Sequence, residues 1–434
     1  MMVAFIIPLI AALIVVIMAI SPKWGGIVML CCYLLMPEMP IDIGLHLKKN
    51  HVLMLVVLTF FARRISLVHN LRYAPFMFCI LYLGYSLLLA PFKELKFSIQ
   101  LYHIIYDGAI VLLFPIVIWN IFIRYNCIRQ YRIALIICIV IASIYGLFLT
   151  LTNGLNPWTM LFSLLQGEGM SLWSQYYADE SRLFGRISSV FFHPMQYAAF
   201  LGFSVLYIIY IRNRIKKSFF ILIMLILIIN LVTCGVRSVI GAIIVTMLFY
   251  LLLRKNWGVA MKLMILTTVV LSVTMAIPGL DSYIASIFSK PEDSSVGGSS
   301  IEMRFEQLIG AFDEIKNNPL LGNGYGWSKE YLVENKSHPI LLGFESIIFV
   351  VLCNNGIIGL FLFALFGLWY YLYINKHVNN RSKPFFICLI IYYYTYECIT
   401  GEFAFQFFML FYTFMLFEYY NNHQIFISEI KNEK

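Results

Sequence analysis

Three arginines, two of them at the ends of long apolar segments, are the residues best suited to chemistry in this sequence. Arg237 lies in the stretch TCGVRSVIGA, and no other charged residue occurs between Phe219 and Leu253. Arg186 opens the stretch GRISSVFFHPMQYAAF, and Arg304 lies in a polar tract nearer the C-terminus. A guanidinium stays protonated, and its planar fork binds two phosphate oxygens at once. The three arginines are therefore candidates for binding a phosphate or pyrophosphate, unless each only extends its charged end to ordinary lipid headgroups.

A carboxylate opens the apolar stretch GFESIIFVVLCNNGIIGL, which covers residues 343–360. An ionised group at membrane depth is costly unless it is paired or faces water. Glu345 therefore indicates either an ion-pair partner for one of the arginines or a base that accepts a proton. We predict that Glu345 and Arg237 are catalytic, and that Arg186, Arg237 and Arg304 bind pyrophosphate.

Other ionisable residues near the ends of apolar segments are weaker candidates for contact with a substrate. They are Arg182, His193, His338, Glu397 and Glu402. The alternatives are a packing role for His193 and solvated helix ends for the two glutamates. The sequence leaves open which of Arg182 and Arg186 enters the site. One more acid, Asp107, lies within an apolar segment.

The composition predicts the fold class. Of the 434 residues, 61% are hydrophobic and only 12% are charged, which is typical of an all-α polytopic membrane protein. We predict about 12 or 13 transmembrane helices, each roughly long enough to cross a bilayer. The segments are 2–20, 25–38, 51–63, 74–91, 100–123, 131–152, 188–211, 218–233, 238–253, 262–278, 344–373, 384–399 and 404–420.

The same segments define the predicted organisation of the chain. The predicted parts are N-terminal transmembrane helices (1–152), an outer loop (153–187), central transmembrane helices (188–278), a large outer loop (279–343), C-terminal transmembrane helices (344–420) and a cytoplasmic tail (421–434). Basic residues gather on the side opposite the 279–343 loop, so the positive-inside rule places that loop outside and the C-terminus in the cytoplasm. The net charge of +9 is thus a topology signal and does not indicate nucleic-acid binding.

The sequence indicates no cofactor. It has no CxxC pair and no glycine-rich nucleotide-binding motif, so we expect neither a metal nor ATP-driven transport. In the 279–343 loop, Ser299 and Glu302 resemble a capping box for a helix from about 301 to 316. Apolar residues recur along that helix at three- and four-residue spacing, namely Ile301, Phe305, Leu308, Phe312 and Ile315. The helix is predicted to lie on the membrane surface or to cover a cavity.

These features resemble the O-antigen ligase and polymerase superfamily of bacterial surface-polysaccharide assembly. The resemblance covers residues 185–360 through the two arginine motifs, the loop helix with its turn (RFEQLIGAFDEIKNNPLLGNGYG) and the stretch from residue 343. Ligases of this group carry a histidine, then Asn, Ser or Gln, nine residues, and Gly-x-x-Gly. Here Glu345 stands in place of that histidine, followed by Ser346, nine residues and GIIG. This departure favours the repeat-unit polymerase branch (Wzy-type).

The resemblance implies a C-type glycosyltransferase fold and a reaction without metal or nucleotide sugar. The growing glycan on undecaprenyl pyrophosphate would be the donor, and a lipid-linked repeat unit the acceptor. It also implies a bacterial cytoplasmic (inner) membrane location with the site facing outward. Implied partners are the lipid bilayer, a chain-length regulator and a flippase. The product would be O-antigen, capsule or exopolysaccharide.

Two alternatives remain open at this point. The first is a ligase that transfers finished glycan to lipid A core, with His338 or His193 in place of the missing histidine. The second is a flippase for the lipid-linked unit. Flippases also need charged cavity residues, but they usually lack an outer loop of this size with an ordered helix.

Overall fold

A computed structural model describes residues 13, 16–17, 20–36, 40–42, 46–48, 77–108, 121, 125, 127–152, 156–158, 186–191, 193–262, 264–265, 301–401 and 418. Its elements are α2 (Pro22–Leu35), β1 (Pro40–Asp42), β2 (His46–Lys48), α5 (Met77–Leu89), η1 (Ala90–Phe92), α6 (Phe97–Gly108), α8 (Ile128–Leu151), α11 (Pro194–Tyr210), η3 (Arg212–Arg214), α12 (Lys217–Thr233), α13 (Arg237–Leu253), α16 (Ile301–Glu314), α17 (Trp327–Asn335), α18 (Ile347–His377) and α19 (Lys383–Thr400).

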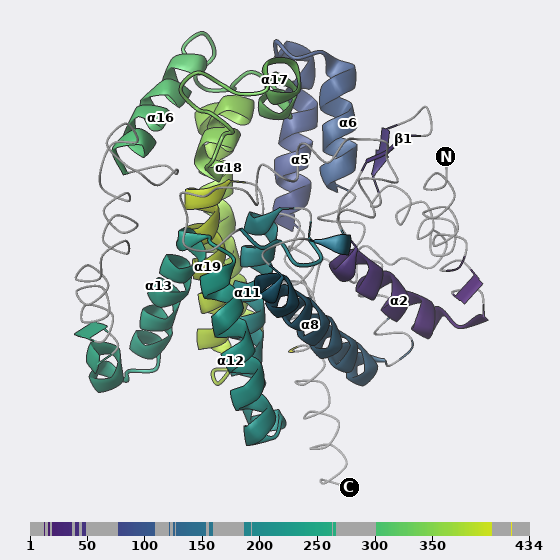
Figure 1. The fold of residues 1–434 in the computed structure, drawn as a ribbon. Helices are drawn as coiled ribbons and strands as arrows, with labels where there is room; N and C mark the ends of the chain where they lie inside the picture. The colour runs from purple at the N-terminus through teal and green to yellow at the C-terminus, as the bar shows by residue number, and fades with distance from the viewer. Residues whose placement is uncertain are drawn as a thin grey trace, which may run out of the picture.

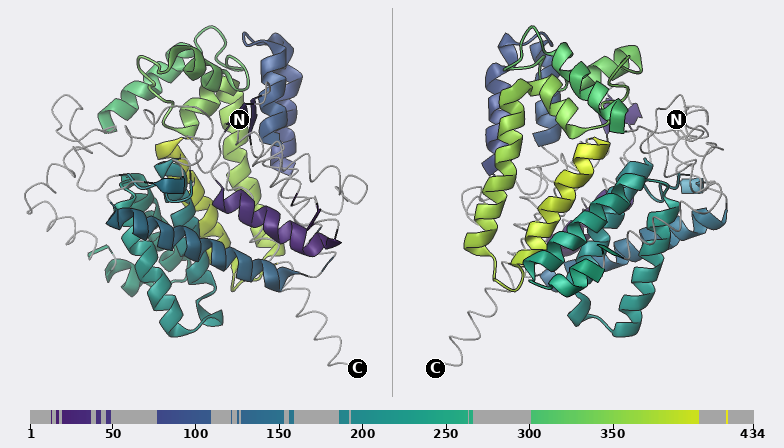
Figure 2. Two further views of the ribbon diagram at one scale, coloured as in Figure 1. Left: turned by 45° about the vertical axis from the view of Figure 1, so that its right-hand side comes forward. Right: turned by 90° about the vertical axis from the view of Figure 1, so that its left-hand side faces the viewer.

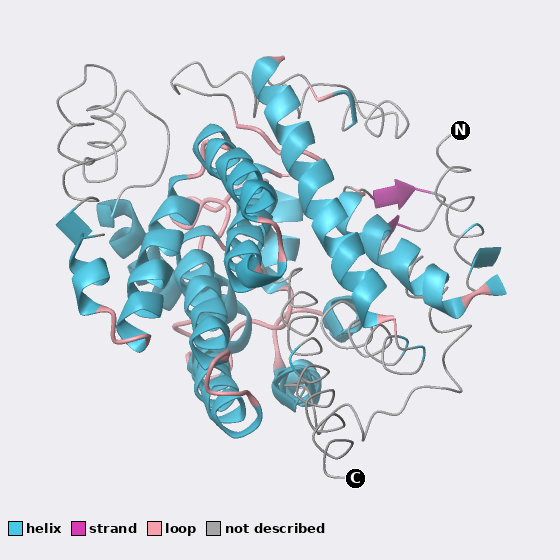
Figure 3. Ribbon diagram, turned by 90° about the horizontal axis from the view of Figure 1, so that it is seen from below, coloured by secondary structure: helices cyan, strands magenta, loops and turns pink. Residues whose placement is uncertain are grey.

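The described residues are predominantly helical, as the sequence predicted (Figure 3). The all-α prediction omitted one feature, a small antiparallel sheet in which Pro40 pairs with Lys48 and Asp42 with His46. Among the described helices, α8 and α18 are long and apolar enough to span a membrane, and α2, α11, α12 and α13 are shorter apolar helices. Each of these helices overlaps a predicted transmembrane segment. The total number of spans stays a prediction.

The helices form two tiers (Figures 1 and 2). Helices α16 and α17 lie at the top of Figure 1, α17 beside the tips of α5 and α6 and α16 on the other side of α18, while α8, α11, α12, α13 and α19 form a bundle below them. We call the end of this bundle nearest α16 and α17 its upper end. In the right-hand view of Figure 2 the long second half of α18 runs down alongside α19.

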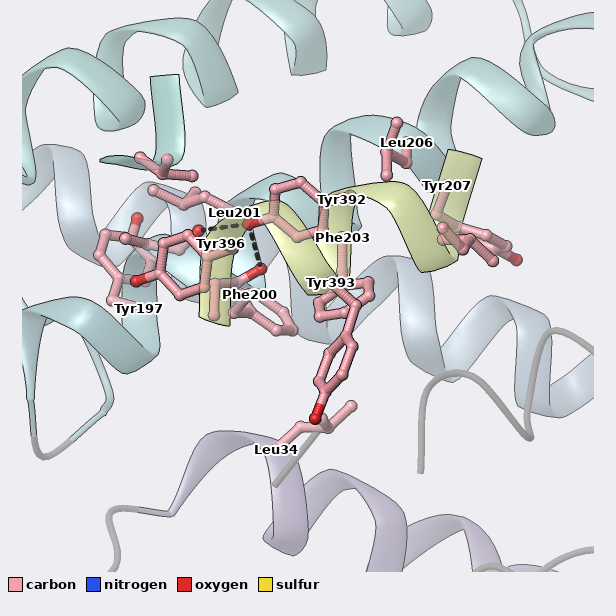
Figure 4. Close-up of a cluster of buried hydrophobic side chains, with 14 of the residues drawn as sticks. Leu34, Tyr197, Phe200, Leu201, Phe203, Leu206, Tyr207, Tyr392, Tyr393 and Tyr396 are labelled. Atoms are coloured by element: carbon pink, nitrogen blue, oxygen red, sulfur yellow. Dashed lines mark hydrogen bonds between the residues drawn. The ribbon is translucent and has the colours of Figure 1, made fainter. Parts of the chain in front are cut away.

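Helix α11 is the core of the lower bundle. Every residue from Gln196 to Ile208 is buried, because α12, α13 and α19 all pack against this helix. Two tyrosine hydroxyls of α19 donate hydrogen bonds to backbone carbonyls of α11. Tyr392 donates to the carbonyl of Ala199 at 3.2 Å, and Tyr396 donates to that of Met195. Figure 4 shows these rings lying against α11. Such donors are satisfied inside the bundle without water.

This packing gives a stability prediction at Gly202. A Cβ there would overlap the ring and hydroxyl of Tyr392. We expect Gly202→Ala to lower the free energy of unfolding by about 1–3 kcal/mol, the usual effect of overpacking, and to lower the melting temperature in detergent. The control is Gly241→Ala on α13, where no neighbouring atom lies within 4 Å of the added carbon. Equal melting of the two variants would contradict the close α11–α19 contact.

Helix α16 confirms the predicted loop helix but corrects its predicted apolar face. The side that packs on the protein includes Leu308 and Ala311, together with Ile315 directly after the helix. Phe305 and Phe312, which the prediction placed on that same face, are exposed by 65% and 47%. The reason is that α16 packs through a face shifted around the helix, which also buries the polar Gln307. The predicted cap at Ser299 lies outside the described residues.

Candidate functional site

Arg304 and Glu345 form an ion pair between α16 and the segment that leads into α18. Arg304 Nη2 lies 3.0 Å from Glu345 Oε2, and Nη1 donates to the Glu345 backbone carbonyl at 2.7 Å. The same Nη1 donates to Oε1 of Gln307 at 3.2 Å. Of the two roles considered for Glu345, the ion pair is therefore the one seen in the structure. The two side chains remain 23% and 32% exposed, so the pair is open to solvent.

The electrostatics of Arg304 reflect its surroundings. Burial lowers the pKa of the Arg304 guanidinium, and the neighbouring Glu345 carboxylate opposes that shift. An arginine pKa nevertheless stays far above neutral pH, so the group carries its charge under physiological conditions. The site thus holds a fixed cation whose present counter-ion is a carboxylate.

Ser346 fixes the position of Glu345. Its hydroxyl caps α18 by accepting from the N–H of Ile348 at 3.2 Å, and it donates to the carbonyl of Cys398 near the end of α19 at 2.8 Å. A serine hydroxyl can do both because it carries one proton and two lone pairs. Glu345 is therefore held where the beginning of α18 meets the upper end of α19.

Helix α18 is interrupted at Gly356, where φ is 66° and ψ is −165°. After the break, the N–H groups of Ile357 and Ile358 donate to carbonyls of the turn at 319–324, at 3.0 and 3.2 Å. Before the break, two carbonyls of α18 accept from N–H groups of the same turn, each at 2.9 Å. The turn therefore replaces the helical hydrogen bonds that the break removes.

The break reverses the course of the chain. Ser346 donates a hydrogen bond to Cys398, and Phe363 accepts one from Tyr394. Cys398 and Tyr394 are four residues apart on α19, which is about 6 Å along the helix axis. A continuous helix would separate Ser346 from Phe363 by about 26 Å. The first half of α18 must therefore rise from the end of α19 and turn at Gly356, after which the second half descends.

The two halves of α18 have different surroundings. Every residue from Phe349 to Gly356 is buried, because α5, α16 and α17 all contact α18. The second half exposes an apolar stripe, formed by Ile357, Phe361, Leu365, Leu368 and Leu372. The single segment predicted at 344–373 is thus divided: residues 357–377 have a face suited to lipid, whereas residues 347–355 are enclosed by protein.

Gly356 should accept no other residue. Its φ is in the left-handed region, and an added Cβ would collide with the carbonyl of Leu320. We expect Gly356→Ala to displace the 319–324 turn and to lower the melting temperature by several degrees, since strain at such a site costs about 1–3 kcal/mol. The control is Gly84→Ala on α5, where the added carbon meets no atom within 4 Å. Unchanged melting of Gly356→Ala would contradict the described break.

The N-terminal end of α11 lies at the upper end of the bundle. Tyr392 and Tyr396 bond to progressively earlier residues of α11, so α11 and α19 are antiparallel. His193, which caps α11, is therefore at the same end as Cys398. Arg186, a half-buried residue shortly before it, is within electrostatic range of His193.

The direction of α12 and α13 places Arg237 at the upper end of the bundle as well. Helix α12 returns beside α11, where Tyr197 donates to Asn230 Oδ1 at 2.7 Å. A tight turn at Gly235 then leads into α13, which begins at Arg237 and runs parallel to α11. The half-buried Arg237 thus begins its helix at the upper end of the bundle. Arg186, Arg237 and Glu345 are therefore contributed to the upper end of the bundle by three separate elements, and Arg304 of α16 joins them through its contact with Glu345.

The two candidate histidines have structural hydrogen bonds. His193 Nδ1 accepts from the N–H of Met195 at 3.2 Å. His338 is 3% exposed, and its Nδ1 accepts from the N–H groups of Ile340 and Leu341 at 3.2 and 2.9 Å. The proton of a neutral His338 therefore lies on Nε2, which is 3.0 Å from Glu314 Oε1. The structure gives His338 the role of a buried turn-stabilising residue.

Three other candidates do not form part of the described site. Glu397 is fully buried in α19, so it presents no surface to a substrate, contrary to the expectation for a solvated helix end. The cause is that α11, α13 and α18 all pack on α19. Arg182 and Glu402 lie outside the described residues.

Sequence reasoning missed the connection between α6 and α17. Asp107 Oδ2 accepts from the Tyr325 hydroxyl at 2.9 Å and lies 3.2 Å from Lys329 Nζ. His103 Nε2 lies 2.8 Å from Glu330 Oε1. The sequence signalled only that Asp107 needed a partner, because the partners are more than 200 positions away. Gln307 was also missed, since a glutamine carries no charge signal.

The fold and the site together define a helical protein of the membrane type with an arginine–carboxylate site at one end of its bundle. A family model described as O-antigen ligase matches residues 222–364. That range contains Arg237, Arg304, Glu345 and the break at Gly356. The comparison with curated proteins found no match.

The family match supports the O-antigen ligase and polymerase superfamily and does not distinguish its ligases from its polymerases. Together with the apolar helices, it indicates a membrane protein of surface-polysaccharide assembly. Members of this superfamily are enzymes of the glycosyltransferase kind.

Proposed function

We propose that this protein polymerises oligosaccharide repeat units linked to undecaprenyl pyrophosphate, at the outer face of a bacterial cytoplasmic membrane. The observation that carries the proposal is the Arg304–Glu345 contact of 3.0 Å within the family-matched residues. It joins a group that can neutralise a pyrophosphate to a group that can accept a proton. The product is an O-antigen, capsular or exopolysaccharide chain, and a flippase and a chain-length regulator are the expected partners.

The proposed reaction is a displacement at the anomeric carbon of the growing glycan. A hydroxyl of the acceptor unit forms the new carbon–oxygen bond, and the bond from the anomeric carbon to the phosphate oxygen breaks. The electron pair leaves with undecaprenyl pyrophosphate, and the hydroxyl proton passes to Glu345. Neither a metal nor a nucleotide sugar takes part in the proposed scheme.

The arginines are proposed to stabilise the leaving pyrophosphate, whose negative charge grows in the transition state. The position of Arg237 supports this role. A cation in the first turn opposes the helix dipole and destabilises a helix by about 0.3–1 kcal/mol, whereas an anion bound there is stabilised. Arg237, as the first residue of α13, thus stands where the helix dipole would also favour a bound anion.

The described histidines favour a polymerase over a ligase. The ligase signature needs a histidine where this chain has Glu345, and both candidate substitutes, His193 and His338, already accept backbone hydrogen bonds. The matching family model nevertheless describes O-antigen ligases, so a ligase is the second candidate. It would transfer finished glycan to lipid A core.

The test is a reconstitution of the purified protein in liposomes with lipid-linked repeat units. We expect lipid-linked products of two, three and more units, with release of undecaprenyl pyrophosphate and no requirement for nucleotide sugar. Transfer that occurs only when lipid A core is added would identify a ligase. Movement of the lipid-linked unit across the bilayer without any new glycosidic bond would identify a flippase. Either of these outcomes would overturn the proposal.

A further inference from the structure

The contacts of Arg304 are of two kinds. Two of them go to groups with little freedom: the backbone carbonyl of Glu345 and the side chain of Gln307, a residue that is fully buried. The third goes to the Glu345 carboxylate, which is the end of a side chain that is 32% exposed. The guanidinium is therefore held in place even when the carboxylate moves away.

The Glu345 carboxylate offers Arg304 the same kind of hydrogen-bond acceptor as a phosphate would. Both groups offer anionic oxygens in the spacing that a guanidinium fork binds. A pyrophosphate carries more charge than one carboxylate, so it can compete for the same donors at a site open to solvent. While Oε2 accepts from Arg304, the carboxylate is held beside the guanidinium and is not turned toward a sugar hydroxyl bound elsewhere in the site.

We propose that the Glu345 carboxylate occupies the pyrophosphate position on Arg304 in the empty enzyme and that the donor displaces it. The displaced side chain then swings toward the acceptor hydroxyl and takes its proton. The base becomes available only after the donor has bound, so no proton is taken from an acceptor while the pyrophosphate position is empty. This inference rests on the proposed function and adds an order of events to it.

The experiment measures the binding of inorganic pyrophosphate to the full-length protein in lipid nanodiscs by calorimetry. Glu345→Asp keeps the negative charge but is one methylene shorter, so it cannot maintain the contact with Arg304. Glu345→Gln keeps the length but loses the charge that strengthens the hydrogen bond. We expect both variants to bind pyrophosphate about fivefold or more tightly than the wild type, because an internal competitor has been weakened.

Two controls define the outcomes. Glu306→Gln removes an exposed carboxylate on the same helix and measures the general effect of charge, which we expect to be smaller. Arg304→Ala should weaken pyrophosphate binding. If the wild type binds and Arg304→Ala weakens binding, but neither Glu345 variant tightens it, the displacement is wrong and the proposed pyrophosphate site stands. Absence of binding by all forms would overturn the pyrophosphate site and the displacement together.

Discussion

Glu345→Ala is expected to slow chain extension by about 10²–10⁴-fold, the usual contribution of a positioned general acid or base. The alanine variant has no group that can accept the proton of the acceptor hydroxyl at the position that Arg304 and Ser346 define. The measurement is the initial rate of extension of lipid-linked repeat units by purified protein in liposomes. In cells, single repeats should persist while long glycan disappears.

A loss of rate must be separated from a loss of folding, because Arg304 loses its counter-ion in this variant. Glu345→Gln retains a hydrogen-bond acceptor of the same length and should be about as slow as Glu345→Ala, with a melting temperature near that of the wild type. Glu306→Ala, which removes an exposed carboxylate from α16, should extend chains at the normal rate. Wild-type extension by Glu345→Gln would show that Glu345 is not the base.

Arg237→Ala is expected to reduce the same rate by about 10²–10³-fold, as removal of one donor to a developing negative charge typically does. The reason is that α13 begins with Arg237 at the upper end of the bundle, where Glu345 also lies. Arg237→Lys should recover part of the rate, because an ammonium supplies charge without the bidentate fork. Chain-length distributions in cells provide a second readout.

The matched control for Arg237 lies at the other end of the same helix. Arg254 follows α13 and is exposed, so Arg254→Ala removes an equal charge without reaching the proposed site. We expect its rate of extension to be that of the wild type. Full activity of Arg237→Ala, with normal amounts of protein in the membrane, would remove Arg237 from the pyrophosphate site.

Much of the fold could be predicted because hydropathy is a local property. The apolar segments at 131–152, 218–233, 238–253 and 384–399 each overlap an observed helix. The loop helix from about 301 to 316 appears as α16, ending two residues early. The face of α16 could not be predicted, because the pattern identifies apolar positions but not the surface that covers them.

The site could be predicted only in part. Glu345 and the arginines could be selected as candidates because charge among apolar residues is rare and costly. Their partners were not, since Arg304 and Glu345 are 41 positions apart and three arginines were equally eligible. Glu397 looked like an exposed helix end in sequence, yet α19 is surrounded by other helices, which bury it.

The sequence by itself determined a helical membrane chain and the charged residues that chemistry would need. It did so because apolar length and isolated charge depend only on residue type and order. Only the tertiary structure decided that Arg304 holds Glu345 and that α18 turns back at Gly356. Both depend on hydrogen bonds to segments that are distant in the sequence. The turn at 319–324 provides the donors and acceptors that the broken helix lacks, and no local sequence pattern predicts that contact.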